Sequence, residues 1–595
     1  MLVRDRLAAT VSVLAILAAA CGNGAASSGG TPSAGAGSGA AAASGGRPNT
    51  AGAGGAGGSS GAGGNTAANA GATQGGSSGS GANGAGALSD AGRPGAGGAA
   101  GAQGGNAGAG MAGRGARGGA GGKQNAGGAS GTTGSGVSGG SGGARPVVTA
   151  AQGTTLVKVN SAVRHQTFEG WGTSLCWWAH HVGAWDTSGL NAVVAAVVDP
   201  VNGLGYNVFR YNIGGGDDPA HHHLDQYKDM PGFEPSAGTW DFTADAEQRA
   251  VLQQILASGT GIILEAFSNS PPYWMTKSGC ASGSSDGSNN LKDDSYDAFA
   301  DYLTEVVKHY RDAFGITFRT LEALNEPSAD WWKANGGQEG CHFSASNQQT
   351  IVKAVAAKLS AKGLTDTSVS ASDENSIDDG YNNLRAFDAA SLAALGQMNV
   401  HTYAGSRRAD LRTLATSKGK RLWQSESGPL NQTLADDTEA AIFMAGRIIT
   451  DLRDLQAEAW VDWQSGDTNH NWGSFTLNDS KQTWSPLKRF YMHAGFSRYI
   501  RPGAVFVDID DSDMVAALSA DGHSLTIVVR NGDTSKSKGF TFDLTALQAV
   551  GATVEGHRTS RSEDLTALPA TALDGYSFVA TIPAFSVTTF VVPLP

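Results

Sequence analysis

Two glutamates, Glu326 and Glu426, are the residues of this chain best suited to chemistry, because each closes a short apolar run. Glu326 stands in the motif Leu-Asn-Glu-Pro, and Glu426 stands in Trp-Gln-Ser-Glu-Ser-Gly. Glycoside hydrolysis requires two carboxyl groups at one bond: one protonates the departing oxygen, and the other attacks the anomeric carbon or activates a water. A lone glutamate more often forms an ion pair on a solvated loop, so the interpretation depends on the elements that position the pair.

The two glutamates would face each other if the runs that they close are strands of one barrel. From residue 168 onward, short apolar runs alternate with segments of helical period, which is the pattern of βα units around a parallel sheet. A closed (β/α)₈ barrel has eight such strands and holds its active site at their C-terminal ends. We expect Glu326 to end the fourth strand and Glu426 the seventh. The eight expected strands are 168–172, 208–213, 262–267, 321–326, 368–372, 398–403, 421–426 and 459–463.

Helices and a second, all-β region complete the expected fold. Apolar residues recurring at three- and four-residue steps predict helices at 296–314, 347–359 and about 436–455. After residue 496 the pattern changes to short alternating strands, with a hairpin expected from 514–518 and 525–529. The fold class is therefore α/β: a TIM barrel with a small antiparallel β-sandwich side domain, into which an N-terminal strand is paired.

The first 147 residues differ in composition from the rest. Arg4 and Arg6 precede an apolar stretch that ends at Ala20-Cys21-Gly22, which predicts a lipoprotein signal peptide with Cys21 lipidated; an ordinary secretory signal is the alternative. The following Gly/Ala/Ser-rich segment has too few apolar residues to fold, so we expect a disordered tether. The expected divisions are the signal peptide at 1–20, the tether at 21–147, the N-terminal strand of the sandwich at 148–166, the catalytic barrel at 167–495 and the C-terminal β-sandwich at 496–595.

Charge and cysteine content limit the kinds of ligand and partner that the chain is expected to bind. A formal net charge of −12 without a basic block excludes a nucleic-acid-binding protein. Cys280 and Cys341 follow strand candidates in Gly-rich loops, so we expect a disulfide between them and a free Cys176. The cysteine spacing fits no zinc site, and the histidines at 221–223 are adjacent on one loop, so we expect neither metal nor cofactor. We expect a monomer that touches a membrane only through its lipid, at the bacterial cell surface or outer membrane.

Six stretches of the barrel region together resemble one enzyme family. The sequence resembles glycoside hydrolase family 30, and within it the endo-β-1,6-galactanase group, over roughly residues 150–595. The resemblance is specific in the barrel and weaker in the β-domain. The stretches that carry it are 168–178, 209–219, 265–275, 324–332, 335–343 and 422–428.

The resemblance implies a retaining, endo-acting enzyme that cleaves β-1,6-linked galactan. It implies that Glu326 is the acid/base and Glu426 the nucleophile, with their carboxyl groups about 5–5.5 Å apart. Two alternatives stay open. One is another retaining activity of the family, a β-1,6-glucanase or a xylanase. The other is a surface carbohydrate-binding lipoprotein that has lost its chemistry.

Four polar neighbours have expected roles. Asn325 precedes the acid and is expected to hydrogen-bond the sugar 2-OH. Arg210 is expected to hold a carboxylate ionised, although an ordinary ion pair is an equal alternative. Tyr403 and His401 are expected to hydrogen-bond Glu426, and for His401 a satisfied interior histidine is an equal alternative.

Seven tryptophans fall at or just beyond the expected strand ends. Aromatic faces stack on the C–H faces of sugars, so their number at one barrel mouth favours a saccharide cleft over a small polar ligand. We expect about half of them to touch substrate, and we select Trp171, Trp274, Trp332 and Trp463. The seven are Trp171, Trp177, Trp178, Trp274, Trp331, Trp332 and Trp463.

Overall fold

The computed structural model describes residues 145–429, 436–469 and 471–595. The predicted signal peptide, the lipidation at Cys21 and all but the last three residues of the predicted tether lie outside this range. Within it, no helix combines the length and the apolar character that a membrane crossing requires.

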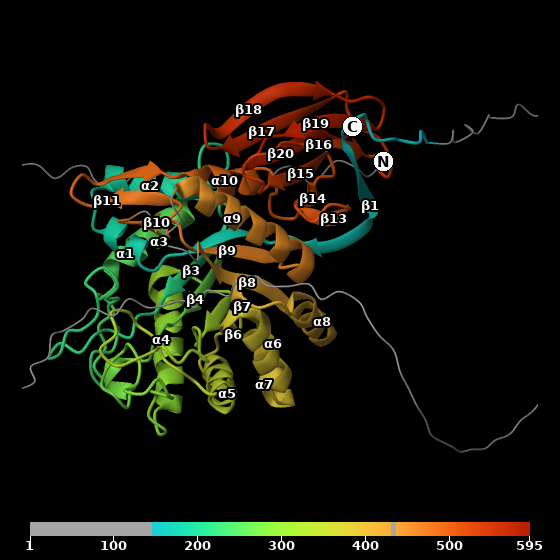
Figure 1. The fold of residues 1–595 in the computed structure, drawn as a ribbon. Helices are drawn as coiled ribbons and strands as arrows, with labels where there is room; N and C mark the ends of the chain where they lie inside the picture. Colours follow the sequence, from blue (N-terminus) through green and yellow to red (C-terminus); the bar gives the residue numbers. More distant parts are fainter. Residues whose placement is uncertain (1–144, 430–435, 470) are drawn as a thin grey trace, which may run out of the picture. The chain divides into compact units, whose positions relative to one another are not determined.

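Eight parallel strands close into a barrel in chain order, β2 to β9, and every predicted barrel strand is confirmed (Figure 1). Both faces of such strands are covered, and accordingly every residue of β2, β3, β5, β8 and β9 except Arg421 is buried. The strands are β2 Gly170–Ser174, β3 Val208–Asn212, β4 Ile263–Phe267, β5 Thr320–Glu322, β6 Ser368–Ser376, β7 Leu395–Ala404, β8 Arg421–Ser427 and β9 Ala459–Gln464.

The helices lie between the barrel strands, as the periodicity predicts. Helix α4 spans Tyr296–Phe314, as predicted, and ends at Gly315, whose left-handed backbone (φ 67°) suits a residue without a Cβ. Helix α5 extends two residues beyond the prediction at each end, and the third predicted helix is divided into α9 and a π-helical turn, η2. The helices are α1 Trp178–Gly183, α2 Thr187–Val198, α3 Ala246–Ser258, η1 Tyr273–Met275, α4, α5 Ala345–Ala361, α6 Ile377–Ala386, α7 Ala389–Ala394, α8 Arg408–Lys418, α9 Asp437–Thr450, η2 Asp451–Leu455 and α10 Lys488–Ser497.

The β-domain is a nine-stranded sheet with an apolar core of its own. The predicted hairpin is confirmed, since Met514 pairs with Val529 and Leu518 with Leu525. The order is β18-β17-β20-β15-β14-β13-β1-β16-β19, and β10-β11-β12 form a separate three-stranded sheet. The strands are β1 Thr155–Thr167, β10 Gly466–Asp467, β11 Phe475–Asn478, β12 Thr483–Pro486, β13 Val505–Ile509, β14 Met514–Leu518, β15 Ser524–Asn531, β16 Lys538–Asp543, β17 Thr553–Ser560, β18 Glu563–Ala572, β19 Ser577–Ile582 and β20 Ser586–Pro593.

The N-terminal strand β1 belongs to this sheet although it precedes the barrel in sequence. Figure 1 shows it among the orange and red strands of the C-terminal region. It pairs antiparallel with β13 and parallel with β16, so the sheet is not purely antiparallel as expected. Val157 and Val159 of β1 are buried in the core of the sheet. The barrel is therefore inserted between two parts of one β-domain.

The structure also corrects two predictions about individual side chains. Trp171 is the second residue of β2, is 1% exposed, and donates its indole N–H to the carbonyl of Ile500 at 2.7 Å. It packs against Phe168 and Phe496, so Trp171 is a core residue near the start of its strand and is withdrawn as a candidate substrate contact.

The second correction concerns the predicted Cys280–Cys341 disulfide. Among the described residues, Cys176, Cys280 and Cys341 are all free thiols. The sulfur of Cys280 contacts Asn335, whereas Cys341 is buried with its sulfur toward the carbonyl of His342. Both cysteines lie in the predicted loops, but their side chains are directed to different partners.

Candidate active site

The two glutamates reach the barrel mouth from different kinds of backbone. Glu426 is the sixth residue of β8, whereas Glu326 lies four residues beyond the end of β5, in a loop and not in the strand as predicted. Its backbone is left-handed (φ 47°), and its N–H donates to the carbonyl of Asp373 at 2.8 Å. Both side chains are nearly buried, at 7% and 5% exposure.

The carboxyl groups of Glu326 and Glu426 converge on one imidazole. Nδ1 of His401 lies 3.4 Å from Oε1 of Glu326 and 3.4 Å from Oε1 of Glu426. The three contacting atoms lie within 4.8 Å of one another. Such a short gap matches the separation of about 5–5.5 Å that retaining glycosidases need, and not the roughly 6.5–9.5 Å that leaves room for a water in inverting enzymes.

His401 is a fully buried cation. Its Nε2 lies 3.2 Å from Oδ2 of Asp373. Although burial opposes its charge, the carboxylates of Glu426 and Asp373 raise the pKa of His401 to about 10. His401 is therefore mainly protonated at neutral pH, with Nδ1 facing Glu326 and Glu426 and Nε2 facing Asp373.

Arg210 contacts the carboxylates of Asp373 and Glu426, and also that of Glu265. Its guanidinium donates to Oε1 of Glu265 at 2.8 Å and to Oδ2 of Asp373 at 2.5 Å, and it lies 3.6 Å from Oε2 of Glu426. Burial would raise the pKa of the Asp373 carboxyl, but Arg210 and His401 outweigh it and lower that pKa. Asp373 stays ionised, and the guanidinium takes part in both a structural ion pair and the site.

Each of the two predicted catalytic carboxyl groups accepts a further hydrogen bond. The hydroxyl of Tyr403 donates to Oε1 of Glu426 at 3.1 Å. The amide of Asn375 donates to Oε1 of Glu326 at 2.6 Å. Sequence reasoning missed Asn375 and Asp373, because neither stands in a motif that marks it as a site residue.

Burial sets the ionisation of the predicted nucleophile. It raises the pKa of Glu426 to about 7, and the cations His401 and Arg210 oppose that rise. Glu426 is thus ionised in a growing fraction as pH increases through 7. The positive charges of His401 and Arg210 therefore increase the fraction of Glu426 that is ionised at a given pH.

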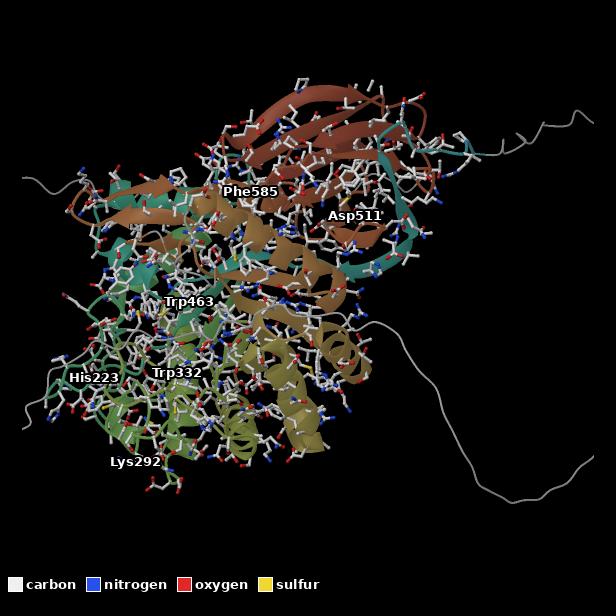
Figure 2. All side chains as sticks on the ribbon, in the orientation of Figure 1. His223, Lys292, Trp332, Trp463, Asp511 and Phe585 are labelled. Atoms are coloured by element: carbon white, nitrogen blue, oxygen red, sulfur yellow. The ribbon has the colours of Figure 1, made fainter. Side chains whose placement is uncertain are left out.

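The predicted tryptophans differ in exposure. Trp332 is 4% exposed and donates its N–H to the carbonyl of Glu326 at 3.1 Å. Trp463 is 8% exposed and packs edge-on against Trp177, with ring centroids 5.2 Å apart. Trp274 is partly buried and donates to the carbonyl of Glu234 at 2.7 Å. Trp332 and Trp463 are labelled in Figure 2.

Several buried polar atoms at the ends of the barrel strands have no hydrogen-bond partner within the described residues. They are Nε1 of Trp177 after β2, Oδ1 of Asn269 after β4, Oδ1 of Asn325 after β5 and Oε2 of Glu426 in β8. A buried polar atom without a partner is costly. Donors and acceptors of this kind, gathered at the strand ends beside apolar indoles, suit a ligand rich in hydroxyl groups. Asn269 lies in the stretch 265–275 that carries the family resemblance, but it was not predicted as a site residue.

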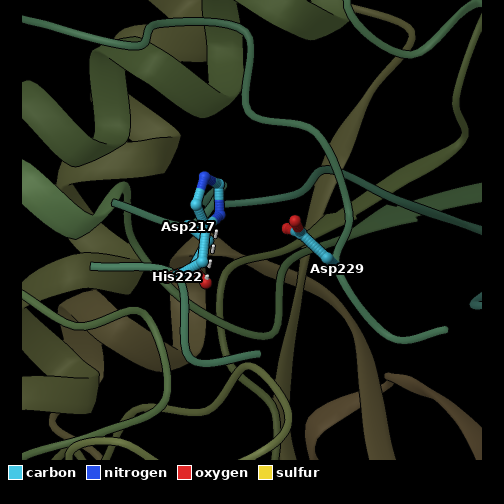
Figure 3. Close-up of side chains that lie close together, drawn as sticks. All are labelled: Asp217, His222 and Asp229. Atoms are coloured by element: carbon cyan, nitrogen blue, oxygen red, sulfur yellow. Dashed lines mark ion pairs between the residues drawn. The ribbon is translucent and has the colours of Figure 1, made fainter. Parts of the chain in front are cut away.

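The loop after β3 carries a second cluster. Asp217, His222 and Asp229 present ligand atoms within 4.8 Å of one another (Figure 3). Oδ2 of Asp217 already accepts from the backbone N–H groups of His223 and Leu224, at 2.7 and 3.0 Å. The side chain of His222 is 69% exposed. Asp217 therefore organises this loop, and two of the three adjacent histidines face it: His223, with Nδ1 2.7 Å from Oδ1, and His222, with Nδ1 3.9 Å from Oδ2.

Comparisons with known proteins agree with this geometry. The family model described as O-Glycosyl hydrolase family 30 matches residues 154–418. An endo-beta-1,6-galactanase of Hypocrea rufa is 34% identical over 425 residues, which cover 67% of this chain and 86% of the relative. An exo-beta-1,6-galactobiohydrolase of Bifidobacterium longum is 24% identical over 66% of this chain and 36% of the relative. The catalytic domain of the GH30 xylanase C of Talaromyces cellulolyticus shares the fold, with 21% identity and a TM-score of 0.57 over 74% of this chain and 100% of that one.

Proposed function

Because the chain belongs to glycoside hydrolase family 30, we propose that it cleaves β-1,6-linked galactan at internal bonds with retention of configuration. The substrate follows from the endo-beta-1,6-galactanase of Hypocrea rufa, which this chain covers over most of its length. That the chain is a glycoside hydrolase rests on its family and on the geometry of the site, whereas the identity of the substrate is our proposal.

The convergence of Glu326 and Glu426 within 4.8 Å is the observation that carries the mechanism. In the first step, the Glu426 carboxylate attacks the anomeric carbon while Glu326 protonates the glycosidic oxygen, so the C–O bond breaks and the leaving sugar departs as an alcohol. In the second step, Glu326 takes a proton from water, the water oxygen attacks the anomeric carbon, and the Glu426 carboxylate is released.

The surrounding residues have roles in these steps. His401 and Arg210 stabilise the ionised form of Glu426 by charge, and Tyr403 fixes one of its oxygens by a hydrogen bond. Asn325 is 6% exposed with a free amide oxygen, which supports its proposed contact with the sugar. That contact strengthens in the transition state if it involves the 2-OH.

An assay of the purified chain on three polysaccharides tests the substrate. We expect release of reducing ends from β-1,6-galactan and little from β-1,6-glucan or glucuronoxylan. Preference for either of the latter would assign a different activity of the family. NMR of the first product is expected to show the β-anomer, and an α-anomer would contradict double displacement.

The variant Glu426→Gln separates an enzyme from a binding protein. It keeps the size of the side chain but lacks the nucleophile, so we expect loss of turnover by at least about 10³-fold with galactan affinity retained. Unchanged turnover would show that Glu426 is not the nucleophile. Binding of galactan without any turnover by the unaltered chain would favour the carbohydrate-binding alternative.

We further propose that the mature protein is a secreted monomer, held at the bacterial surface through a lipid on Cys21. The support is the sequence alone, a short apolar stretch that closes at Ala20-Cys21. Mass spectrometry of the mature protein is expected to find a lipidated Cys21 at the N-terminus, and an unmodified terminus elsewhere would refute the anchor. Size-exclusion chromatography tests the monomer.

A further inference from the structure

Trp331 is the most exposed of the thirteen tryptophans, with half of its surface open to solvent. The other twelve are buried or partly buried. An isolated exposed apolar residue is common and needs no explanation by itself. Trp331, however, lies five residues after Glu326, in the loop that follows β5. This position suggests a role in substrate binding.

The loop that carries Trp331 is fixed to the catalytic acid. The neighbouring Trp332 donates its indole N–H to the carbonyl of Glu326, and its ring lies so close to Gly340 that a Cβ there would be 2.1 Å away. Ala334 donates its N–H to the carbonyl of Ser284 at 2.7 Å. Before Trp331, Ala329 donates its N–H to the carbonyl of Glu326 at 3.0 Å, so the backbone is hydrogen-bonded on both sides of the indole.

Trp331 follows the predicted acid/base closely along the chain. In the proposed mechanism Glu326 protonates the glycosidic oxygen, so the segment that continues from Glu326 begins beside the leaving sugar. The ring of Trp331 meets the ring of Trp332 at a tilt of 60°, with centroids 6.0 Å apart. Its exposed part is thus open to a ligand beside the buried anchor.

We propose that Trp331 is the stacking platform for the galactosyl residue on the leaving-group side of the cleavage site. This inference rests on the proposed function. A β-galactosyl ring carries its axial hydroxyl on one face and several C–H groups on the other, and the C–H face suits an indole. Trp331 thereby favours substrates that continue beyond the cut bond, which is a requirement for internal cleavage.

Steady-state kinetics on β-1,6-galacto-oligosaccharides of two to five residues test the proposal. For Trp331→Ala we expect kcat/KM on the longer oligosaccharides to fall about five-fold or more, mainly through KM, and transfer to an added galactose acceptor to fall in parallel. Trp331→Phe keeps an aromatic face and is expected to recover most of the loss. The control is Phe443→Ala, which removes a similarly exposed ring (40%) on α9.

The outcomes separate this inference from the proposed function. If the unaltered chain cleaves galactan and Trp331→Ala matches Phe443→Ala at every length, the platform is refuted and the galactanase stands. If the unaltered chain prefers another β-glycan, the galactan proposal fails, and the same series on that glycan decides whether Trp331 binds its leaving group. If it cleaves none of them, both proposals fall.

Discussion

Replacing His401 by Asn removes a buried positive charge from between the two catalytic carboxyl groups. Asn keeps a hydrogen-bond donor near the place of Nδ1 but carries no charge. Two unit charges 3.4 Å apart interact with about 5 kcal/mol at an effective dielectric of about 20. Because one pKa unit corresponds to about 1.36 kcal/mol, the upward pKa shift of Glu426 is at most about 3.6 units, and water entering the space reduces it.

The expected result is an upward shift of the acidic limb of kcat/KM by at least one pH unit. Glu426 must be ionised to attack, and its pKa of about 7 rises when the opposing cation is lost, so the variant needs a higher pH to form the nucleophile. With a shift of one unit, the ionised fraction at pH 6 falls about ten-fold, whereas at pH 8 it falls only about two-fold.

The measurement is kcat/KM on β-1,6-galactan from pH 4.5 to 9 for the unaltered chain and the variant. A matched control is His493→Asn, because burial lowers the pKa of His493 to about 3 and the substitution therefore removes no charge. The control is expected to keep the acidic limb in place. An acidic limb that stays fixed or moves down in His401→Asn would refute the charge argument.

Three further outcomes are expected. Glu326→Ala should regain turnover on an activated aryl glycoside when azide is added and yield a β-glycosyl azide; an α-azide, or no rescue, would contradict its role as acid/base. Gly340→Ala should lower stability by about 1–3 kcal/mol, measured by thermal or denaturant unfolding, because its Cβ would overlap the Trp332 ring; an unchanged midpoint would contradict the packing there. The unaltered chain should melt at the same temperature with and without a thiol reductant, because no bond joins Cys280 and Cys341; a large drop on reduction would restore the disulfide.

The sequence predicted those features of the fold that depend on the local periodicity of apolar residues. All eight barrel strands and helix α4 follow from apolar runs and helical spacing, which depend on neighbours along the chain. The convergence of Glu326 and Glu426 followed from counting the strands, although Glu326 turned out to lie beyond its strand. The predicted convergence was therefore correct although the predicted end of the fourth strand was wrong by four residues.

What the sequence missed depends on contacts between distant segments. Asp373 and Asn375 reach the site because β6 ends beside β7 and the loop of Glu326, and neither stands in a distinctive motif. Trp171 was misplaced because its strand starts at residue 170, so the indole lies near the beginning of β2. The thiols of Cys280 and Cys341 were paired from loop position alone, which carries no information about side-chain direction.

The placement of β1 decides how the folded region responds to mechanical load. The chain enters the fold through this strand, whose ladders run to β13 and β16, and only afterwards continues into β2. A pull on the preceding segment is therefore borne in shear by the hydrogen bonds of the nine-stranded sheet before it reaches the barrel.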